Sequence, residues 1–589
     1  MHHEIEDSLK FKLSVSGILY RQSPYVCCSP VNLQTNCYYA VTELIIKCGY
    51  RHLQMSSLIE NLKFLIVDDY ADMRSVLQNM LLSFGVQNIN IASNGKDAIR
   101  AIEHQRYDVI LCDYNLGEGR DGQQVLEEIR HRKLIGVGTV FLMVTAENTR
   151  VMVMGAVEYE PDSYLTKPFT KDLLGQRLTN LLNMKADLVE IEQAIANRDH
   201  DLANRLIDDK LERKSKNQNI LTRLKAELAL QDRYFNEAIS IYKGVLEHRE
   251  IAWARLGLGK ALYYKEDYSE AKKVFNELIS ENERFMSAYD WLAKSQQMLD
   301  ELDEAQDILR KGAVLSAKAI PRQKALADLA LRNGDDKTAE KALLQAVTLG
   351  KHSIYKHPSM FSNIAQIKAK NGHQGEAERF VRDINKNFKG NPEAELYTAI
   401  SNSMILEDEA AVQKNMQIAA ELFNDLGAST SPQIAVDMAK AYSHAGDEQK
   451  AKQVLHQAAS NNHADAEVLK GISDTLGELK LEDDPKAIIS KIRKEIIQLN
   501  NEGARLARDG KLKEATQLFE NAVEGMPANI VVNLNAARTF LMYMEQAGVT
   551  TELASKLEKY LRRAQSIEPD NRSLLILRKR SKKLLDSNS

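Results

Sequence analysis

The sequence FLIVDDY, residues 64–70, decides the fold of the first part of the chain. Four apolar residues end in two adjacent carboxylates, Asp68 and Asp69, and this pattern predicts a buried strand of a parallel sheet. The carboxyl ends of such strands are where an open α/β sheet binds its ligands. Two carboxylates there repel each other unless a cation lies between them, and Mg²⁺ prefers oxygen ligands. The pair alone is equally compatible with a simple helix cap.

Short apolar strands alternate with amphipathic helices from Lys63 onward. Five such βα units predict a doubly wound α/β domain with a five-stranded parallel sheet. The apolar residues of its first helix, which are expected to face the core, are Val76, Leu77, Met80, Leu81 and Phe84. The expected strands are 63–67, 89–92, 108–113, 139–145 and 163–166, and the expected helices are 71–84, 96–103, 123–131 and 171–182.

Charged or hydroxyl-bearing residues stand at the ends of four of these strands. Asp68 and Asp69 end the first strand, and Asp113 ends the third. Thr145 ends the fourth, and Lys167 follows the fifth. Because the carboxyl ends of parallel strands share one edge, three carboxylates, a hydroxyl and an ammonium group are expected to meet in one crevice. Each residue alone could be a cap or a solvated charge, but their convergence favours a functional site.

This segment resembles the receiver domain of two-component response regulators, which has a flavodoxin-like fold. The resemblance implies that Asp113 is the phosphoacceptor, which takes a phosphoryl group from a histidine kinase or a phosphotransfer protein. It also implies that Asp68 and Asp69 hold Mg²⁺ together with Asp113 and the backbone carbonyl of Asn115. A carboxylate nucleophile forming an acyl phosphate, with positive charge to neutralise the transferring group, agrees with these roles.

The remaining site residues follow from the same resemblance. Lys167 and Thr145 are expected to bind the phosphoryl oxygens, and the peptide bond between Lys167 and Pro168 is expected to be cis. Thr145 and Tyr164 are expected to form the switch pair, in which the hydroxyl moves toward the phosphoryl group and the ring turns inward behind it. The resemblance also implies that the face made by the fourth helix, the fifth strand and the fifth helix changes on phosphorylation.

Asn115 and Glu147 match the receiver positions that place an attacking water and tune dephosphorylation. We therefore predict rapid loss of the phosphoryl group, and a half-life of many hours with Mg²⁺ would contradict this. No catalytic residue is expected beyond these. The chain is thus predicted to be a regulatory phosphoacceptor protein that catalyses only its own phosphorylation and dephosphorylation, rather than an enzyme.

Composition bounds the rest of the chain. The chain has 589 residues, of which 44% are hydrophobic and 27% are charged, so it should form two or more globular domains. Its net charge of −4 does not indicate a basic surface for binding nucleic acid. No apolar run approaches the roughly 18 residues that span a bilayer, and no secretory signal precedes the first strand. The expectation is a cytoplasmic protein that binds neither nucleic acid nor membrane.

Cysteine is concentrated at the N-terminus. Four of the five cysteines lie within residues 1–54, and the fifth is Cys112. Their spacing fits neither a zinc site nor a disulfide framework, and Met55 opens a more ordinary start. Residues 1–54 are therefore predicted to be an irregular leader, either disordered or a start-site artefact. The four cysteines are Cys27, Cys28, Cys37 and Cys48.

Beyond residue 186 a helical pattern repeats. An alanine recurs on the second helix of each unit, at an interval of about 34 residues in most units. A small residue lies twelve positions before each alanine, a large apolar residue lies four positions after most of them, and glycine often lies five positions before. The alanines are Ala238, Ala271, Ala305, Ala339, Ala377, Ala411, Ala451 and Ala515. The interval is wider from Ala339 to Ala377, from Ala411 to Ala451 and, most of all, from Ala451 to Ala515.

This period and pattern resemble the tetratricopeptide repeat (TPR), whose length is about 34 residues. The small residues should let paired helices approach closely, and the large ones should fill the gap to the next unit. The pattern is weak around Ala411, where Asn415 replaces the large residue. The resemblance implies a curved all-α solenoid whose concave surface binds a protein partner, which the sequence does not identify.

The expected domains are the receiver at 60–184, a connecting helical hairpin at 185–216, the TPR-like solenoid at 217–570, and a basic helix end and tail at 571–589. No flexible spacer separates receiver and hairpin, so their connection is expected to be stiff. The predicted function is that of a phosphorelay response regulator whose phosphorylation regulates protein binding by the solenoid. The alternatives are a phosphoryl sink or inhibitor of a sensor kinase docked through the repeats, and a phosphorylation-independent scaffold.

Overall fold

The computed structural model describes residues 59–136, 138–146, 161–427 and 430–586. Both the leader at 1–54 and Glu147 lie outside the described residues. The first domain is a five-stranded sheet in which every strand pair is parallel, in the order β2-β1-β3-β4-β5. This confirms the predicted flavodoxin-like sheet. The strands are β1 (Lys63–Val67), β2 (Asn88–Ala92), β3 (Val109–Asp113), β4 (Val140–Thr145) and β5 (Ser163–Thr166).

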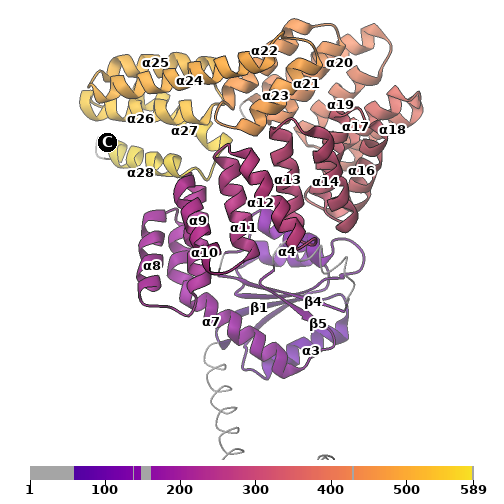
Figure 1. Ribbon diagram of the computed structural model, residues 1–589, viewed down its shortest axis with the longest axis vertical. Coiled ribbons are helices and arrows are strands. Elements are labelled where there is room, and N and C mark those ends of the chain that lie inside the picture. The colour runs from indigo at the N-terminus through magenta and orange to yellow at the C-terminus, as the bar shows by residue number, and fades with distance from the viewer. Residues whose placement is uncertain (1–58, 137, 147–160, 428–429, 587–589) are drawn as a thin grey trace, which may run out of the picture.

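Helices cover both faces of the sheet (Figure 1). Apolar side chains of α3 and α7 share one core with β1, β3 and β4, and those of α4 and α5 share a second core on the other face. The described helices of the domain are α3 (Ala71–Leu82), α4 (Gly95–His104), α5 (Gly122–His131) and α7 (Lys171–Ala196).

One residue of the expected core of α3 is misplaced. Leu77, Leu81 and Phe84 are buried, but Val76 is 44% exposed. A step of one residue rotates a side chain by about 100° around a helix, so Val76 cannot share the face of Leu77 and Leu81. The helix also ends at Leu82, two residues earlier than expected.

Helix α7 serves two cores. Its first half contributes Leu174 and Leu178 to the receiver core, and its second half contributes Leu188 and Ile191 to a core shared with the next two helices. The helix runs for 26 residues without a break and passes through the expected boundary at 184. The receiver is therefore joined to the hairpin by a continuous helix.

The rest of the described chain is helical, and successive helices pack in antiparallel pairs. Among the helices of the described ranges, none combines the length and the apolar composition that spanning a bilayer requires. The helices are α8 (His200–Glu212), α9 (Gln218–Gln231), α10 (Phe235–His248), α11 (Ala252–Tyr264), α12 (Tyr268–Glu281), α13 (Met286–Met298), α14 (Leu302–Leu315), α15 (Ile320–Arg332), α16 (Asp336–Leu349), the 3₁₀ turn η2 (Gly350–His352), α17 (Pro358–Lys370), α18 (Gln374–Asn387), α19 (Pro392–Ile405), α20 (Glu409–Leu426), α21 (Pro432–His444), α22 (Glu448–Asn461), α23 (Ala466–Glu478), α24 (Pro485–Arg508), α25 (Leu512–Gly525), α26 (Ile530–Ala547), α27 (Thr551–Ile567) and α28 (Arg572–Asp586).

The small and large residues of the repeats form the contacts inside this helical array. Seven of the eight anchor alanines are fully buried, and the exception is Ala411 in the weak unit. A Cβ atom on Gly259 of α11 would lie 2.4 Å from the Phe275 ring of its own pair, whereas one on Gly257 would lie 2.3 Å from Tyr242 of the preceding pair. Large side chains therefore fill gaps within a pair as well as between units.

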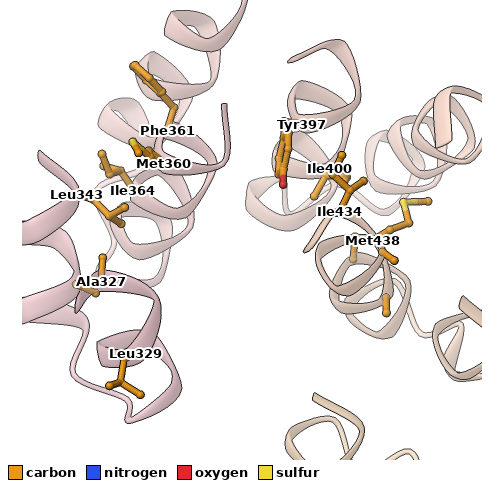
Figure 2. Packing of buried hydrophobic residues seen from close by; sticks show 14 of the residues in the cluster. Ala327, Leu329, Leu343, Met360, Phe361, Ile364, Tyr397, Ile400, Ile434 and Met438 are labelled. Atoms are coloured by element: carbon orange, nitrogen blue, oxygen red, sulfur yellow. The ribbon is translucent and has the colours of Figure 1, made fainter. Parts of the chain in front are cut away.

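The central repeats share one continuous apolar core. In Figure 2, Leu343 of α16 lies near Ala327 of α15 and Ile364 of α17. The same core continues through Tyr397 and Met438 on α19 and α21. Burial of these side chains removes apolar surface from water along the whole array, which is how stacked repeats gain stability.

Two of the wide intervals in the repeat have structural causes. The interval from Ala339 to Ala377 contains the turn η2 and an additional loop before α17. The interval from Ala451 to Ala515 contains α23 and the 24-residue helix α24, which packs against both α23 and α25. One long helix thus belongs to two successive pairs.

Candidate phosphoacceptor site

The strand ends of the sheet bring three carboxylates together. Ligand oxygens of Asp68, Asp69 and Asp113 all lie within 4.8 Å of one another. The Nζ atom of Lys167 lies 2.9 Å from Oδ2 of Asp68 and 3.2 Å from Oδ1 of Asp113. Asp68 is 1% exposed and Asp113 is 8% exposed, so the charges are concentrated in a crevice rather than spread over the surface.

Local backbone contacts hold the acidic pair in place. The residue at the N-cap position of helix α3 is Tyr70, and its side chain makes no capping hydrogen bond. Neither Asp68 nor Asp69 occupies the cap position, so the capping alternative is wrong. Instead, Oδ1 of Asp68 accepts a hydrogen bond of 2.9 Å from the Tyr70 amide. The Arg74 guanidinium donates to the carbonyls of Asp68 and Asp69 at 2.7 and 2.8 Å. The other carboxylate oxygen of Asp68 is the one that meets Lys167.

The other predicted residues lie on β4, on β5 and in the segments that follow β3 and β5. The peptide bond between Lys167 and Pro168 is cis, as expected, and the Lys167 amide donates to the Thr145 carbonyl at 2.7 Å. Thr145 is buried at the end of β4, and Tyr164 is half-buried on β5 beside the second apolar core. Asn115 is exposed, two residues after Asp113.

Sequence reasoning missed the glycine that begins α5. A Cβ atom at Gly122 would lie 2.1 Å from the Asp113 carbonyl oxygen, so no other residue fits without moving the end of β3. The preceding Asp121 accepts a hydrogen bond of 2.8 Å from the Gln124 amide and forms a capping box. The Asp-Gly dipeptide before an amphipathic helix was the available signal.

The electrostatics of the site suit a nucleophile that needs compensating charge. Burial raises the pKa of Asp113 to about 6, the Lys167 charge opposes this rise, and the Asp68 charge adds to it. Burial acts to lower the pKa of Lys167, but its hydrogen bond to Asp68 and the charges of both carboxylates raise it overall. Three clustered carboxylates and one ammonium leave net negative charge, which a hard divalent cation with oxygen ligands would neutralise.

The solenoid contacts the first domain at Tyr114, the residue immediately after Asp113. The Lys318 Nζ atom lies 3.4 Å from the Tyr114 hydroxyl and 5.3 Å from its ring centroid. That hydroxyl donates to Gln123 at 3.1 Å, and Gln123 donates in turn to Glu127 at 3.1 Å. Ser353 of the solenoid donates to Glu127 at 3.2 Å. A line of polar contacts therefore links both sides of the interface to the residue that follows Asp113.

This interface was not predicted from the sequence. Additional contacts are the hydrogen bond of 3.2 Å from Gln124 to the Leu349 carbonyl and the edge-on approach of His131 to Tyr355. Apart from Lys318, the solenoid residues named here fall in the segment 349–357, where the wide interval after Ala339 places its extra loop. The contact uses α5, the helix that follows β3. The irregular spacing was the only sequence signal for it.

Comparison with known proteins identifies the class of this domain. A family model described as "Response regulator receiver domain" matches residues 64–179. The chemotaxis protein CheY-3 of Vibrio cholerae is 32% identical over 124 residues, which are 21% of this chain and 94% of that protein. The chemotaxis protein CheY of Pseudomonas aeruginosa is 31% identical over 120 residues, which are 20% of this chain and 95% of that protein.

One similar solved structure is the signal receiver domain of a putative Luxo repressor protein from Vibrio parahaemolyticus. It is 23% identical, with a TM-score of 0.20, and the match covers 22% of this chain and 97% of that one. Through the relatives that it covers almost completely, the chain belongs to the response regulator receiver family. Its receiver is a regulatory phosphoacceptor domain, which implies interaction with a histidine kinase or a phosphotransfer protein.

Proposed function

We propose that this protein is a phosphorelay response regulator in which phosphorylation of Asp113 regulates protein binding by the helical solenoid. The observation that carries the proposal is the position of Lys167, whose ammonium lies 2.9 Å from Asp68 and 3.2 Å from Asp113. An ammonium held between a metal-type carboxylate pair and a third carboxylate is the arrangement that phosphoryl transfer to an aspartate requires.

In the proposed transfer, a carboxylate oxygen of Asp113 attacks the phosphorus of a phosphohistidine on the donor protein. The new O–P bond forms as the N–P bond breaks, and the imidazole nitrogen leaves with the bonding electron pair. Lys167 and the Thr145 hydroxyl bind the phosphoryl oxygens. Asp113 must be ionised to attack, and its pKa of about 6 permits this at neutral pH.

Three carboxylates within 4.8 Å of one another fit a magnesium ion. Asp68, Asp69, Asp113 and the backbone carbonyl of Asn115 would hold it. When bound, Mg²⁺ supplies positive charge that compensates the carboxylates and the transferring phosphoryl group. Asn115 and Glu147 are proposed to position the water that later removes the phosphoryl group.

Coupling to the solenoid is supported by the polar contacts that start at Tyr114. Thr145 and Tyr164 are proposed to move when the phosphoryl group is present, and a change around Asp113 would then reach Gln123, Glu127 and the solenoid segment 349–357. If this contact differs between two states of the receiver, it changes the relative free energies of the solenoid conformations and so shifts their populations. Repeats of the TPR type would supply the surface for the protein partner.

Phosphotransfer is tested by incubating the full chain with acetyl phosphate and Mg²⁺ and measuring the intact mass. We expect one added phosphoryl group in the natural chain and none in Asp113→Asn, with much slower addition in Lys167→Ala. The matched control is Lys171→Ala, because Lys171 begins α7 and its ammonium lies over the Phe84 ring rather than at the carboxylates. Equal phosphorylation of the Asp113→Asn chain would refute the assignment.

Regulation is tested by partner capture from the native cell extract. The natural chain and Asp113→Ala are each used with and without beryllofluoride and Mg²⁺. A switch predicts that the amount of captured partner changes with beryllofluoride only in the natural chain. Equal capture under all four conditions would exclude the switch and leave a phosphoryl sink or a scaffold.

A further inference from the structure

Helix α23 contacts the first helices of three earlier repeats of the same chain, and Figure 1 shows it beside one of them, α13. The ammonium of Lys294 on α13 lies 2.9 and 3.0 Å from the two carboxylate oxygens of Glu467. The Tyr263 hydroxyl on α11 donates to the same carboxylate at 3.3 Å. Further along α23, Arg332 on α15 is paired with Asp474. The first helices of these repeats are thus in contact with a helix from far along the array.

The two faces of α23 have different roles. Leu469, Ile472 and Leu476 are buried in the central apolar core, and α23 packs against its neighbours α22 and α24. Glu467, Lys470 and Asp474 lie on another face, at relative positions 0, 3 and 7, which align along one side of a helix. The second face consists of charges that alternate in sign and make its long-range contacts. The contacts of this face with the earlier repeats are ion pairs and a hydrogen bond.

Two turns of the earlier repeats have an acidic side chain where later repeats have glycine, whereas the first repeat has Arg233 at this position. Glu266 and Asp300 have φ angles of 69° and 64°, and Gly334 and Gly372 have φ angles of 73° and 78° at the equivalent turn position. An L-residue in this left-handed region costs free energy that glycine avoids. Asp300 and Glu266 are also turn residues that form ion pairs with α23 and α24.

These turn contacts extend the same surface. Asp300 is paired with Lys470 of α23 and lies 2.8 Å from Lys486 of α24. Glu266 accepts hydrogen bonds of 2.6 and 3.3 Å from Arg493 of α24. The two lysines hold the pKa of Asp300 below its ordinary value, so this carboxylate keeps its charge further into the acid range than an isolated aspartate. These ion pairs join both acidic turn residues to α23 and α24.

We propose that the surface formed by Tyr263, Lys294, Asp300 and Arg332 is a docking surface for a partner helix, and that α23 occupies it as an internal ligand. The partner helix is expected to have two carboxylates seven residues apart with a lysine three residues after the first. This is the charge pattern of the α23 face that the surface binds here. The contacts are partly exposed ion pairs, which exchange for equivalent ones more readily than a buried apolar contact.

The docking surface is connected to the receiver through one helix. Lys318, which contacts Tyr114 of the receiver, stands shortly before α15, and Arg332, which contacts α23, ends that helix. The 13 residues of α15 span about 20 Å. A shift of the receiver interface would therefore tilt the element that holds α23. This link to phosphorylation rests on the proposed function, whereas the docking surface itself does not.

The test uses charge reversal in the full chain and a helical peptide probe. The probe is residues 466–478, with a hydrocarbon staple joining positions 472 and 476 on the apolar face, and its helicity is verified by circular dichroism. The chain carrying Glu467→Lys and Asp474→Lys should release α23 and bind the labelled probe at least about tenfold more tightly than the natural chain, in which α23 competes. Glu478→Lys is the matched control, because Glu478 on α23 pairs with Lys440 rather than with the docking surface.

Reversal of the docking surface provides the second half of the test. Adding Lys294→Glu and Arg332→Glu to the chain that carries Glu467→Lys and Asp474→Lys should abolish binding of the unmodified probe sequence. A chain with only Lys294→Glu and Arg332→Glu should bind a probe that itself carries Glu467→Lys and Asp474→Lys. Equal affinity of the probe for the natural and the released chain, or affinity unaffected by reversal of the docking surface, would overturn the proposal. No phosphoryl donor is present, so this result is independent of whether Asp113 is phosphorylated.

Discussion

The receiver site and the solenoid use buried positions for opposite purposes. At the sheet edge, Asp68 and Asp113 are buried together although like charges repel each other, and burial raises the pKa of Asp113 with the Asp68 charge adding to the rise. In the solenoid, the closest contacts are glycines and alanines beneath large side chains such as Phe275. The first arrangement costs stability and provides chemistry, and the second provides stability without chemistry. Substitutions in the two regions should therefore separate function from folding.

The largest effect is expected for phosphoryl acceptance in Asp113→Asn. Phosphorylation by acetyl phosphate should fall to background, by at least about a hundredfold, because the amide is not a nucleophile. Far-ultraviolet circular dichroism should be unchanged, since the substitution removes no packing. If Asp113→Asn lost its helical signal together with phosphorylation, this would contradict the separation of function from folding.

Gly259→Ala should have the opposite profile. The new Cβ atom would lie 2.4 Å from the buried Phe275 ring, so we expect a loss of about 2–3 kcal/mol of stability from overpacking. Phosphorylation per folded molecule should be unaffected. Chemical denaturation measures the change, and Gly244→Ala in α10 is the control, because nothing lies within 4 Å of its Cβ position and the helix should gain up to about 1 kcal/mol. Equal effects of the two substitutions would contradict this packing.

Asp113→Asn should also stabilise the metal-free receiver. The pKa of Asp113 is about 6 in the folded protein against an ordinary value of 3.8, so the ionised carboxylate penalises folding above pH 6 and the penalty disappears below pH 3.8. The substitution should raise stability by about 1–2 kcal/mol near neutral pH and by little near pH 4. Denaturation of both chains across this pH range is the measurement. A destabilised variant at neutral pH would show that Asp113 contributes to folding as well as chemistry.

Magnesium binding should have the matching pH dependence. Protons compete with the cation for Asp113, so the apparent affinity for Mg²⁺ should weaken as the pH falls below about 6. Calorimetric titration of the full chain measures it. In Asp113→Asn the affinity should be lower and its pH dependence near 6 should be lost, and an unchanged dependence would assign the titration to another group.

The smallest effect is expected at the boundary between the two regions. Lys318→Ala removes one partly buried polar contact and one ring contact with Tyr114, so stability should change by less than about 1 kcal/mol. The rate of hydrogen–deuterium exchange of the backbone amides in α5 should nonetheless increase. Unchanged exchange would mean that Lys318 does not hold the interface.

Much of the receiver could be predicted from the sequence because its signals are local. Apolar strands that end in Asp68, Asp113 and Thr145 specify both the sheet and the edge at which the residues meet. The error at Val76 arose from grouping neighbouring apolar residues without regard to the turn angle of the helix. Gly122 was missed because the closeness of α5 to the Asp113 carbonyl depends on the path of the loop between them.

The long-range contacts could not be predicted in the same way. The contacts of Glu127 with Ser353, and of Glu467 with Lys294, join polar residues of types that are usually exposed to solvent, and the partners are far apart in the chain. Polar residues on a helix normally indicate a solvated face, so their pattern contains no information about a distant partner. Only the wide intervals after Ala339 and after Ala451 marked these places, and the width of an interval does not specify what an inserted segment contacts.

The central claim is that the charge state at Asp113 is transmitted to the solenoid through α5. Hydrogen–deuterium exchange of the full chain, with and without beryllofluoride and Mg²⁺, tests it most directly. We predict altered exchange in α5 and in the segment 349–357 of the natural chain, and no change there in Asp113→Asn. Altered exchange confined to the strand ends around Asp113, with 349–357 unaffected, would contradict it.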